Sequence, residues 1–158
     1  MHAGSPDPEE QMAQDTQALA ISLFSEVLAA DQMIRLRLSR VMPKGMEISH
    51  FAVLNHLCWH EEERTPAQLA ATFNVTRGAM TNTLSKLEWA GYVHVRPDWD
   101  DARRKLVAIS PSGRTARDET LKRVAPVVSE VIDQLGTEQV RSVIPILRAL
   151  RTQMAPKS

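Results

Sequence analysis

The 158-residue sequence contains a single cysteine, Cys58, and this scarcity excludes an intramolecular disulfide framework. It also lacks any apolar segment long enough to span a bilayer. The first residues, MHAGSPDPEEQ, show no positively charged stretch followed by an apolar one, so we expect no export signal. These absences predict a cytoplasmic chain that does not associate with a membrane.

Patterns typical of catalysis are also missing. We find no nucleophile–base arrangement and no phosphate-cradling loop. His56 and His60 stand four residues apart, which is metal-ligand spacing on a helix, but no HExxH pattern or partner carboxylate motif accompanies them. We therefore predict no metal site, no cofactor and no enzymatic activity.

Positive charge is concentrated in the middle of the chain, although Lys and Arg balance Asp and Glu overall at 19 each. Residues 64–117 contain nine Lys or Arg and four Asp or Glu, a net charge of +5. Residues 1–63 contain four and ten, a net charge of −6. This distribution predicts a surface for a polyanion in the basic segment.

The basic segment opens with residues 65–87, which read as two short helices joined by a tight turn. Thr65 and Gln68 match a capping box at the start of the first helix. Asn74 suits the left-handed conformation that follows a helix end, and Thr76 suits the N-cap of the second helix. The pattern indicates a helix-turn-helix, although a plain helical hairpin would look similar.

The second helix, residues 76–89, has two different sides. Met80, Leu84 and Leu87 form one apolar stripe, and we expect them to be buried. The other side carries small and polar residues suited to base edges and phosphates, with Arg77 at the N-terminus. This segment is the candidate recognition helix.

A β-hairpin follows directly. Residues 92–96 and 105–109 have strand character and flank a polar turn, and the turn ends in consecutive cations: Arg103, Arg104 and Lys105. An arginine on a narrow ribbon can enter the minor groove, and Asp101 could fix Arg103 by a charge-assisted hydrogen bond. A helix-turn-helix with this hairpin is a winged helix. The alternative interpretation of these charges is a merely soluble hairpin tip.

The flanking segments predict long helices. We expect helices over residues 10–41, 50–60 and 111–135, and a final one capped by Thr137, with Pro126 kinking or splitting the third. Cys58 should be a buried core residue, and Glu61–Glu63 a solvated loop. The terminal helices carry more apolar surface than the winged helix can cover, which predicts a partner chain.

The predicted fold is mainly α with a small β-hairpin wing, an α+β winged helix-turn-helix with long terminal dimerisation helices. We expect residues 1–9 to be a flexible N-terminus. Residues 10–44 and 112–158 form the expected helical dimerisation region, and residues 45–111 the expected DNA-binding domain.

The element order and three local sequences resemble the MarR family of bacterial transcriptional regulators. The matching pieces are LEWAGYV at 87–93, Asp-x-Arg at 101–103 and FAVLNHL at 51–57. The resemblance implies a homodimeric regulator, acting as a repressor, that places recognition helices in successive major grooves of palindromic promoter DNA and wings in the minor grooves. The residues that it implies at DNA are Thr76, Arg77, Gly78, Thr81, Asn82, Lys86, Asp101, Arg103 and Arg104.

The resemblance also implies a small-molecule effector, because many relatives bind anionic aromatic compounds. Met46, His50 and Trp59 are the candidate residues for such a ligand. The chain departs from the family at Trp99, where proline is common in the wing, and at Gly78, where a polar residue is more usual. The alternative function is a winged-helix protein-interaction module that binds no DNA.

Overall fold

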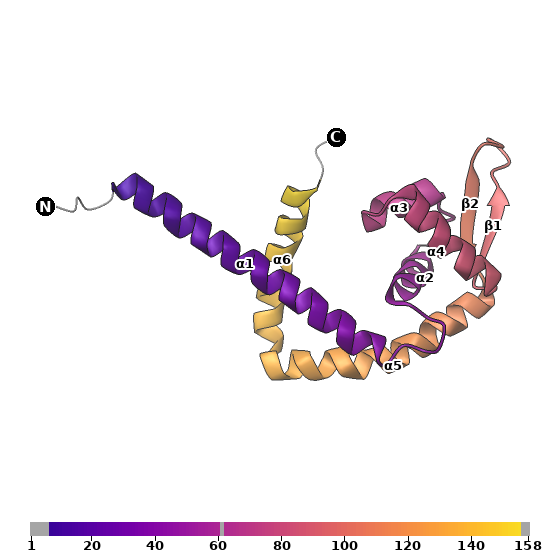
Figure 1. The fold of residues 1–158 in the computed structure, drawn as a ribbon. Helices are drawn as coiled ribbons and strands as arrows, with labels where there is room; N and C mark the ends of the chain where they lie inside the picture. Colours follow the sequence, from indigo (N-terminus) through magenta and orange to yellow (C-terminus); the bar gives the residue numbers. More distant parts are fainter. Residues whose placement is uncertain (1–6, 61, 156–158) are drawn as a thin grey trace, which may run out of the picture. The chain divides into compact units, whose positions relative to one another are not determined.

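Helices dominate the computed structural model, which describes residues 7–60 and 62–155 (Figure 1). Within these residues the chain forms, in order, α1 (Pro8–Ser39), α2 (Ile48–Trp59), α3 (Pro66–Phe73), α4 (Arg77–Trp89), β1 (Val93–Pro97), β2 (Lys105–Ile109), α5 (Pro111–Leu135) and α6 (Thr137–Met154). This order confirms the predicted fold class, mainly α with one hairpin. Among the described helices, none has the length and apolar character needed to cross a membrane.

The first of two compact units ends at Arg40, and its described residues hold α1. The helix begins at Pro8, where the Asp7 carboxylate accepts a hydrogen bond from the Glu9 N–H at 3.2 Å. Pro8 and Glu9 are therefore helical, and the predicted flexible start over residues 1–9 is wrong for them; residues 1–6 lie outside the described part. No residue of α1 is buried, and Leu19 and Leu28 are 72% and 69% exposed.

Residues 41–158 form the second unit, whose core joins the helix-turn-helix to the hairpin. Met80, Leu84 and Leu87 on α4 are buried, as their spacing predicts. They pack in one cluster with Leu54 of α2 and Leu69 of α3, both fully buried. Each such leucine stabilises the fold by about 1.5–3 kcal/mol relative to an exposed side chain.

The hairpin is tied to the chain just before α3. Strands β1 and β2 pair antiparallel, with Val95 opposite Val107. Val107 also exchanges two backbone hydrogen bonds with Arg64, at 3.1 and 2.8 Å. Across this edge the Arg96 guanidinium donates to the half-buried Glu63 carboxylate, with Nε to Oε1 at 3.0 Å. The predicted solvated acidic loop is thus wrong for Glu63, and Glu61 lies outside the described residues.

Helix α4 is followed by a glycine in the left-handed conformation. Gly91 has φ of 75°, its N–H donates to the Glu88 carbonyl at 2.9 Å, and the Tyr92 N–H donates to the Leu87 carbonyl at 2.8 Å. This is a Schellman ending, which glycine adopts without steric cost. The Ser110 hydroxyl, which caps α5, donates to the Gly91 carbonyl at 2.6 Å, so the end of α4 and the start of α5 are joined.

The two C-terminal helices differ from expectation at their junction. Helix α5 continues through Pro126 to Leu135, so it is not split there. Gly136, with φ of 88°, is the N-cap residue of α6, and no side chain caps this end. The prediction that Thr137 caps α6 is therefore wrong, because the helical conformation already includes Thr137.

Gly113 supports a sharp mutational prediction. A Cβ at this position would lie 2.0 Å from the Tyr92 carbonyl oxygen and 2.9 Å from Ile109 Cγ1. Gly113→Ala should therefore lower the free energy of unfolding by about 2 kcal/mol or more. Gly78→Ala is the matched control: no atom lies within 4 Å of its Cβ, and the change should stabilise α4 by up to about 1 kcal/mol. Urea midpoints at one protein concentration measure both, and equal midpoints would contradict the prediction.

Candidate nucleic-acid interface

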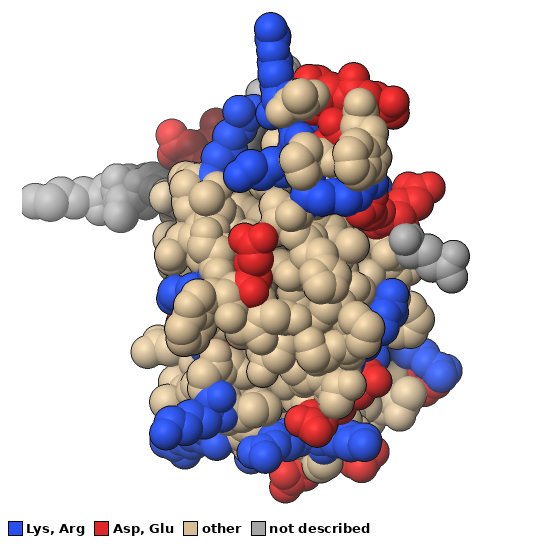
Figure 2. Space-filling view, turned by 90° about the vertical axis from the view of Figure 1, so that its right-hand side faces the viewer, with Lys and Arg blue, Asp and Glu red and all other residues tan. Residues whose placement is uncertain are grey.

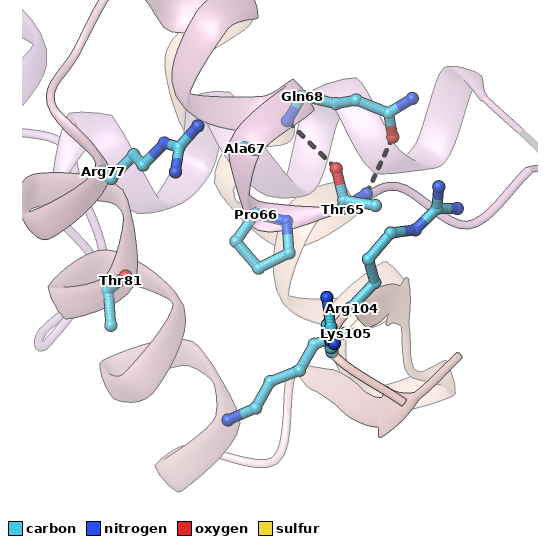
Figure 3. A pocket seen from close by; sticks show the side chains of 9 residues that line it. Thr65, Pro66, Ala67, Gln68, Arg77, Thr81, Arg104 and Lys105 are labelled. Atoms are coloured by element: carbon cyan, nitrogen blue, oxygen red, sulfur yellow. Dashed lines mark hydrogen bonds between the residues drawn. The ribbon is translucent and has the colours of Figure 1, made fainter. Parts of the chain in front are cut away.

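The start of α3 forms the upper wall of the candidate interface in Figure 3. The Thr65 hydroxyl accepts a hydrogen bond from the Gln68 N–H at 3.1 Å, and the Gln68 side-chain oxygen accepts one from the Thr65 N–H at 2.8 Å. This confirms the predicted capping box. The reciprocal bonds satisfy two backbone donors and fix the direction in which the chain enters α3.

The turn between α3 and α4 follows the predicted pattern as well. Asn74 is left-handed, with φ of 51°, and the Val75 N–H donates to the Ala70 carbonyl at 3.0 Å. The Thr76 hydroxyl then accepts a hydrogen bond from the Ala79 N–H at 3.1 Å and caps α4. The exposed face of α4 is thereby held in one orientation to α3.

A hollow of about 540 Å³ lies between these helix ends and the wing. Its cations are Arg77 from α4 and the wing residues Arg103, Arg104 and Lys105. Thr81 and residues 65–68 complete the walls (Figure 3), and none of the described residues that line it is an Asp or Glu. Four cations from two separate elements therefore converge on one surface, which favours an anionic ligand.

All nine residues predicted to touch DNA have exposed side chains or, for Gly78, an exposed backbone. Thr81 and Asn82 face solvent on α4, on the side away from its buried stripe. Figure 2 shows Lys and Arg gathered at the wing end of this unit, beside a group of Asp and Glu and above a largely uncharged middle. Lys and Arg also lie along the lower edge of this face, away from the wing.

The wing tip is built differently from the predicted Asp101–Arg103 pair. The Asp101 carboxylate accepts a hydrogen bond from the backbone N–H of Arg103 at 3.0 Å, rather than from its guanidinium. The ion pair at the tip joins Asp98 to Arg104 at 2.9 Å, and Asp98 is buried. Sequence reasoning missed Asp98, although an Asp whose carboxylate accepts the N–H two residues later is a common turn signal.

Lys86 lies against α2. Its ammonium donates to the Glu47 carboxylate at 3.1 Å. This hydrogen bond, then the charges of His50 and Lys86, lower the pKa of Glu47 below its usual value. His50 is buried, and its Nδ1 accepts a hydrogen bond from the Glu47 N–H at 3.2 Å. In this structure the charge of Lys86 is therefore paired with that of Glu47.

The three candidate effector residues do not meet in one site. His50 lines a second hollow of about 600 Å³, together with Lys44, Lys86, Trp89 and Tyr92. Met46 belongs to the buried core. Trp59 is 74% exposed, and its ring centre lies 5.8 Å from the Arg117 guanidinium carbon.

Comparison with known proteins agrees with this geometry. The sequence profile of the MarR family matches residues 44–104, from the loop before α2 to the end of the wing turn. This segment, which holds α2, the helix-turn-helix and the wing, is similar to the MarR family. Its match to the uncharacterized HTH-type transcriptional regulator YdgG of Bacillus subtilis is 32% identical over 91 residues, which is 56% of this chain and 60% of YdgG. The match thus spans less than two thirds of that relative.

Two solved structures share the fold of this chain. CouR from Rhodococcus jostii, bound to p-coumaroyl-CoA, has a TM-score of 0.71 and 21% identity, over 85% of this chain and 93% of CouR. A mutant of E. coli MarR complexed with operator DNA has a TM-score of 0.66 and 22% identity, over 81% of this chain and 97% of that one. At such identities the likeness establishes the fold.

Cys58 is half-buried, so the prediction of a buried core cysteine is wrong. Its sulfur lies 3.6 Å from Arg114 Nη1 on α5. The position of Cys58 near the C-terminal end of α2, next to the exposed Trp59, explains why the Leu54 and Leu57 stripe does not enclose it.

The ring of His56, on the last turn of α2, lies tilted against that of His60, the residue that follows the helix, with ring centres 4.3 Å apart. A nitrogen of Arg64 lies 3.3 Å from His60 Nδ1. Burial, followed by the charges of His60 and Arg64, lowers the pKa of His56 below its ordinary value of 6.5. The Arg64 guanidinium beside His60 and the lowered pKa of His56 both disfavour additional positive charge at this pair of histidines.

This histidine pair predicts a pH dependence of stability. The unfolded chain takes up a proton at His56 near pH 6.5, while the folded chain resists it. The free energy of unfolding should therefore fall as the pH drops below 6.5, because protons then favour the unfolded state. His56→Gln should make this slope shallower, whereas His94→Gln, an exposed change on β1, should keep it. Urea titrations between acidic and neutral pH give the slopes, and an unchanged slope in His56→Gln would contradict the assignment.

Proposed function

We propose that this chain is a homodimeric transcriptional repressor of the MarR family that binds palindromic promoter DNA and is released by a small molecule. The observation that carries the proposal is the hollow between α4 and the wing, where Arg77, Arg103, Arg104 and Lys105 converge without an acidic neighbour in its described lining. Two further points support DNA as the partner. The face of α4 beside the hollow is exposed, and a family member of the same fold has been solved with operator DNA.

In this proposal the two elements read different grooves. Helix α4 enters the major groove, where Arg77, Gly78, Thr81 and Asn82 face base edges. Thr76 contacts a phosphate, and so does Lys86 once it leaves Glu47. Arg103 enters the minor groove from a loop fixed by Asp101, with Arg104 beside it.

Two alanine variants test this division of work. Asn82→Ala should weaken the free energy of DNA binding by roughly 1–3 kcal/mol per half-site and change which DNA sequence the protein prefers. Arg103→Ala should weaken binding to many sequences and reduce the salt slope by about 1 for each charge removed. Titrations of operator and scrambled duplexes at two salt concentrations separate the two effects.

Three results would count against the proposal. Full affinity and salt slope in Arg103→Ala would remove the wing from the interface. An unchanged operator preference in Asn82→Ala would remove that residue from base readout. If the wild-type chain bound no duplex from its own upstream region, a winged-helix protein-interaction module would be the better explanation.

The proposed homodimer is supported by apolar side chains of α1 and α6 that are exposed in the described residues. On α1, Leu19, Ile21 and Leu28 are more than 60% exposed. On α6, no residue is buried, and Ile146 and Leu147 are 59% and 44% exposed. We therefore propose that residues 10–44 and 112–158 supply the subunit interface and that residues 45–111 bind DNA. Large exposed apolar patches on a folded chain mark such interfaces.

A charge on α6 tests the dimer. Light scattering of the wild type should give twice the chain mass of 17.7 kDa. Leu147→Glu should lower the dimer fraction and the melting temperature together, because interface and fold share apolar contacts. Gln153→Glu, an exposed change on the same helix, is the matched control and should keep the dimer. A stable wild-type monomer at micromolar concentration would overturn the proposed assembly.

We place the effector in the hollow beside His50. The hollow is lined by Lys44 and Lys86, by the Glu47 carboxylate that pairs with Lys86, and by the aromatic residues Trp89 and Tyr92, so an aromatic anion that displaces Glu47 from Lys86 suits it. A ligand there would compete with Glu47 for Lys86 and so disturb the C-terminal half of α4. The solved complex of CouR with p-coumaroyl-CoA supports a small-molecule ligand in this family.

A further inference from the structure

Trp99 lies on the loop that joins β1 to β2, and its side chain is exposed to solvent. It follows β1 and is 84% exposed. The Asp98 N–H donates to the Arg104 carbonyl at 3.0 Å, and the Arg104 N–H donates to the Asp101 carbonyl at 2.9 Å. The Asp98–Arg104 ion pair crosses the same loop at 2.9 Å. The loop is therefore fixed by hydrogen bonds and an ion pair before and after Trp99, and the indole projects from it into solvent.

The indole also has a fixed support behind it. The guanidinium carbon of Arg96 lies 5.6 Å from the centre of the Trp99 ring. Arg96 in turn donates to the Glu63 carboxylate and, at 3.0 Å, to the Pro97 carbonyl. A preorganised side chain loses little conformational entropy when a partner covers it, so its burial contributes more to binding.

The charges of the loop indicate which part of a partner the indole contacts. Asp98 is paired with Arg104, and Asp101 accepts the Arg103 N–H. Asp100 is left as an exposed carboxylate next to Trp99, and it would repel a phosphate at that spot. An uncharged surface suits the indole better. Along DNA, that surface is the sugar edge of the minor groove, beside the bases that Arg103 reaches.

We propose that Trp99 is a second DNA contact of the wing, which packs its indole against deoxyribose at the edge of the minor groove. This inference rests on the proposed function. It adds an apolar contact to the basic ones, as apolar side chains do in many minor-groove complexes. Because no charge is involved, Trp99 contributes affinity without counterion release.

The test is a binding titration of operator duplex at two salt concentrations with wild type, Trp99→Ala, Trp99→Phe and His94→Ala. Trp99→Ala should bind roughly tenfold more weakly with the wild-type salt slope, because it loses apolar burial and no charge. Trp99→Phe should lie in between. His94→Ala, which removes an exposed ring elsewhere on β1, should bind like the wild type. DNA should quench the indole emission of the wild type more than that of Trp99→Ala.

Each other result has a defined meaning. Wild-type affinity and quenching in Trp99→Ala would overturn the inference while leaving the proposed function intact. A reduced salt slope in Trp99→Ala would overturn it too, because the loss would then come from displaced cations such as Arg103. A wild-type protein that binds no duplex would overturn the proposed function, and this inference with it. Urea midpoints confirm that each variant is folded.

Discussion

The interface depends on two backbone hydrogen bonds between Arg64 and Val107. They join the segment before α3 to β2 at a residue whose side chain is fully buried in the core. Two-stranded hairpins are marginal in isolation, and this pairing adds backbone hydrogen bonds to the core packing of Val107 and to the Arg96–Glu63 ion pair. The pairing sets the wing beside the start of α3, so that its cations and Arg77 line one hollow.

Charge distribution around the helix-turn-helix separates two surfaces. On the wing side, four cations share a hollow whose described lining holds no carboxylate. On the α2 side, Lys86 is neutralised by Glu47, which His50 helps to orient through the backbone. The same helix α4 therefore presents Arg77 to the hollow near its N-terminus and the paired Lys86 near its C-terminus. This arrangement gives the proposed effector a direct route to α4, because a ligand anion would compete for Lys86.

Local sequence signals predicted the elements well. The capping box at Thr65, the left-handed Asn74 and the stripe of Met80, Leu84 and Leu87 depend on residues close together in the chain, so pattern alone reveals them. Two of the errors, at Glu63 and Cys58, lie where distant segments meet, whereas the error at Thr137 is local. Glu63 pairs with Arg96, and Cys58 is half-buried beside Arg114, because α5 and β1 happen to pass there. A pattern along one helix cannot show which neighbour covers it.

The sequence by itself determined the winged helix, its recognition helix and its basic segment, because caps, turns and periodicity are local properties of the chain. Tertiary structure alone decided that Arg77 and the wing cations share one hollow, that Asp98 rather than Asp101 forms the ion pair of the wing, and that Lys86 faces Glu47. These outcomes depend on how β2 pairs with Arg64 and how α4 packs on α2, and such contacts join residues that are far apart in sequence.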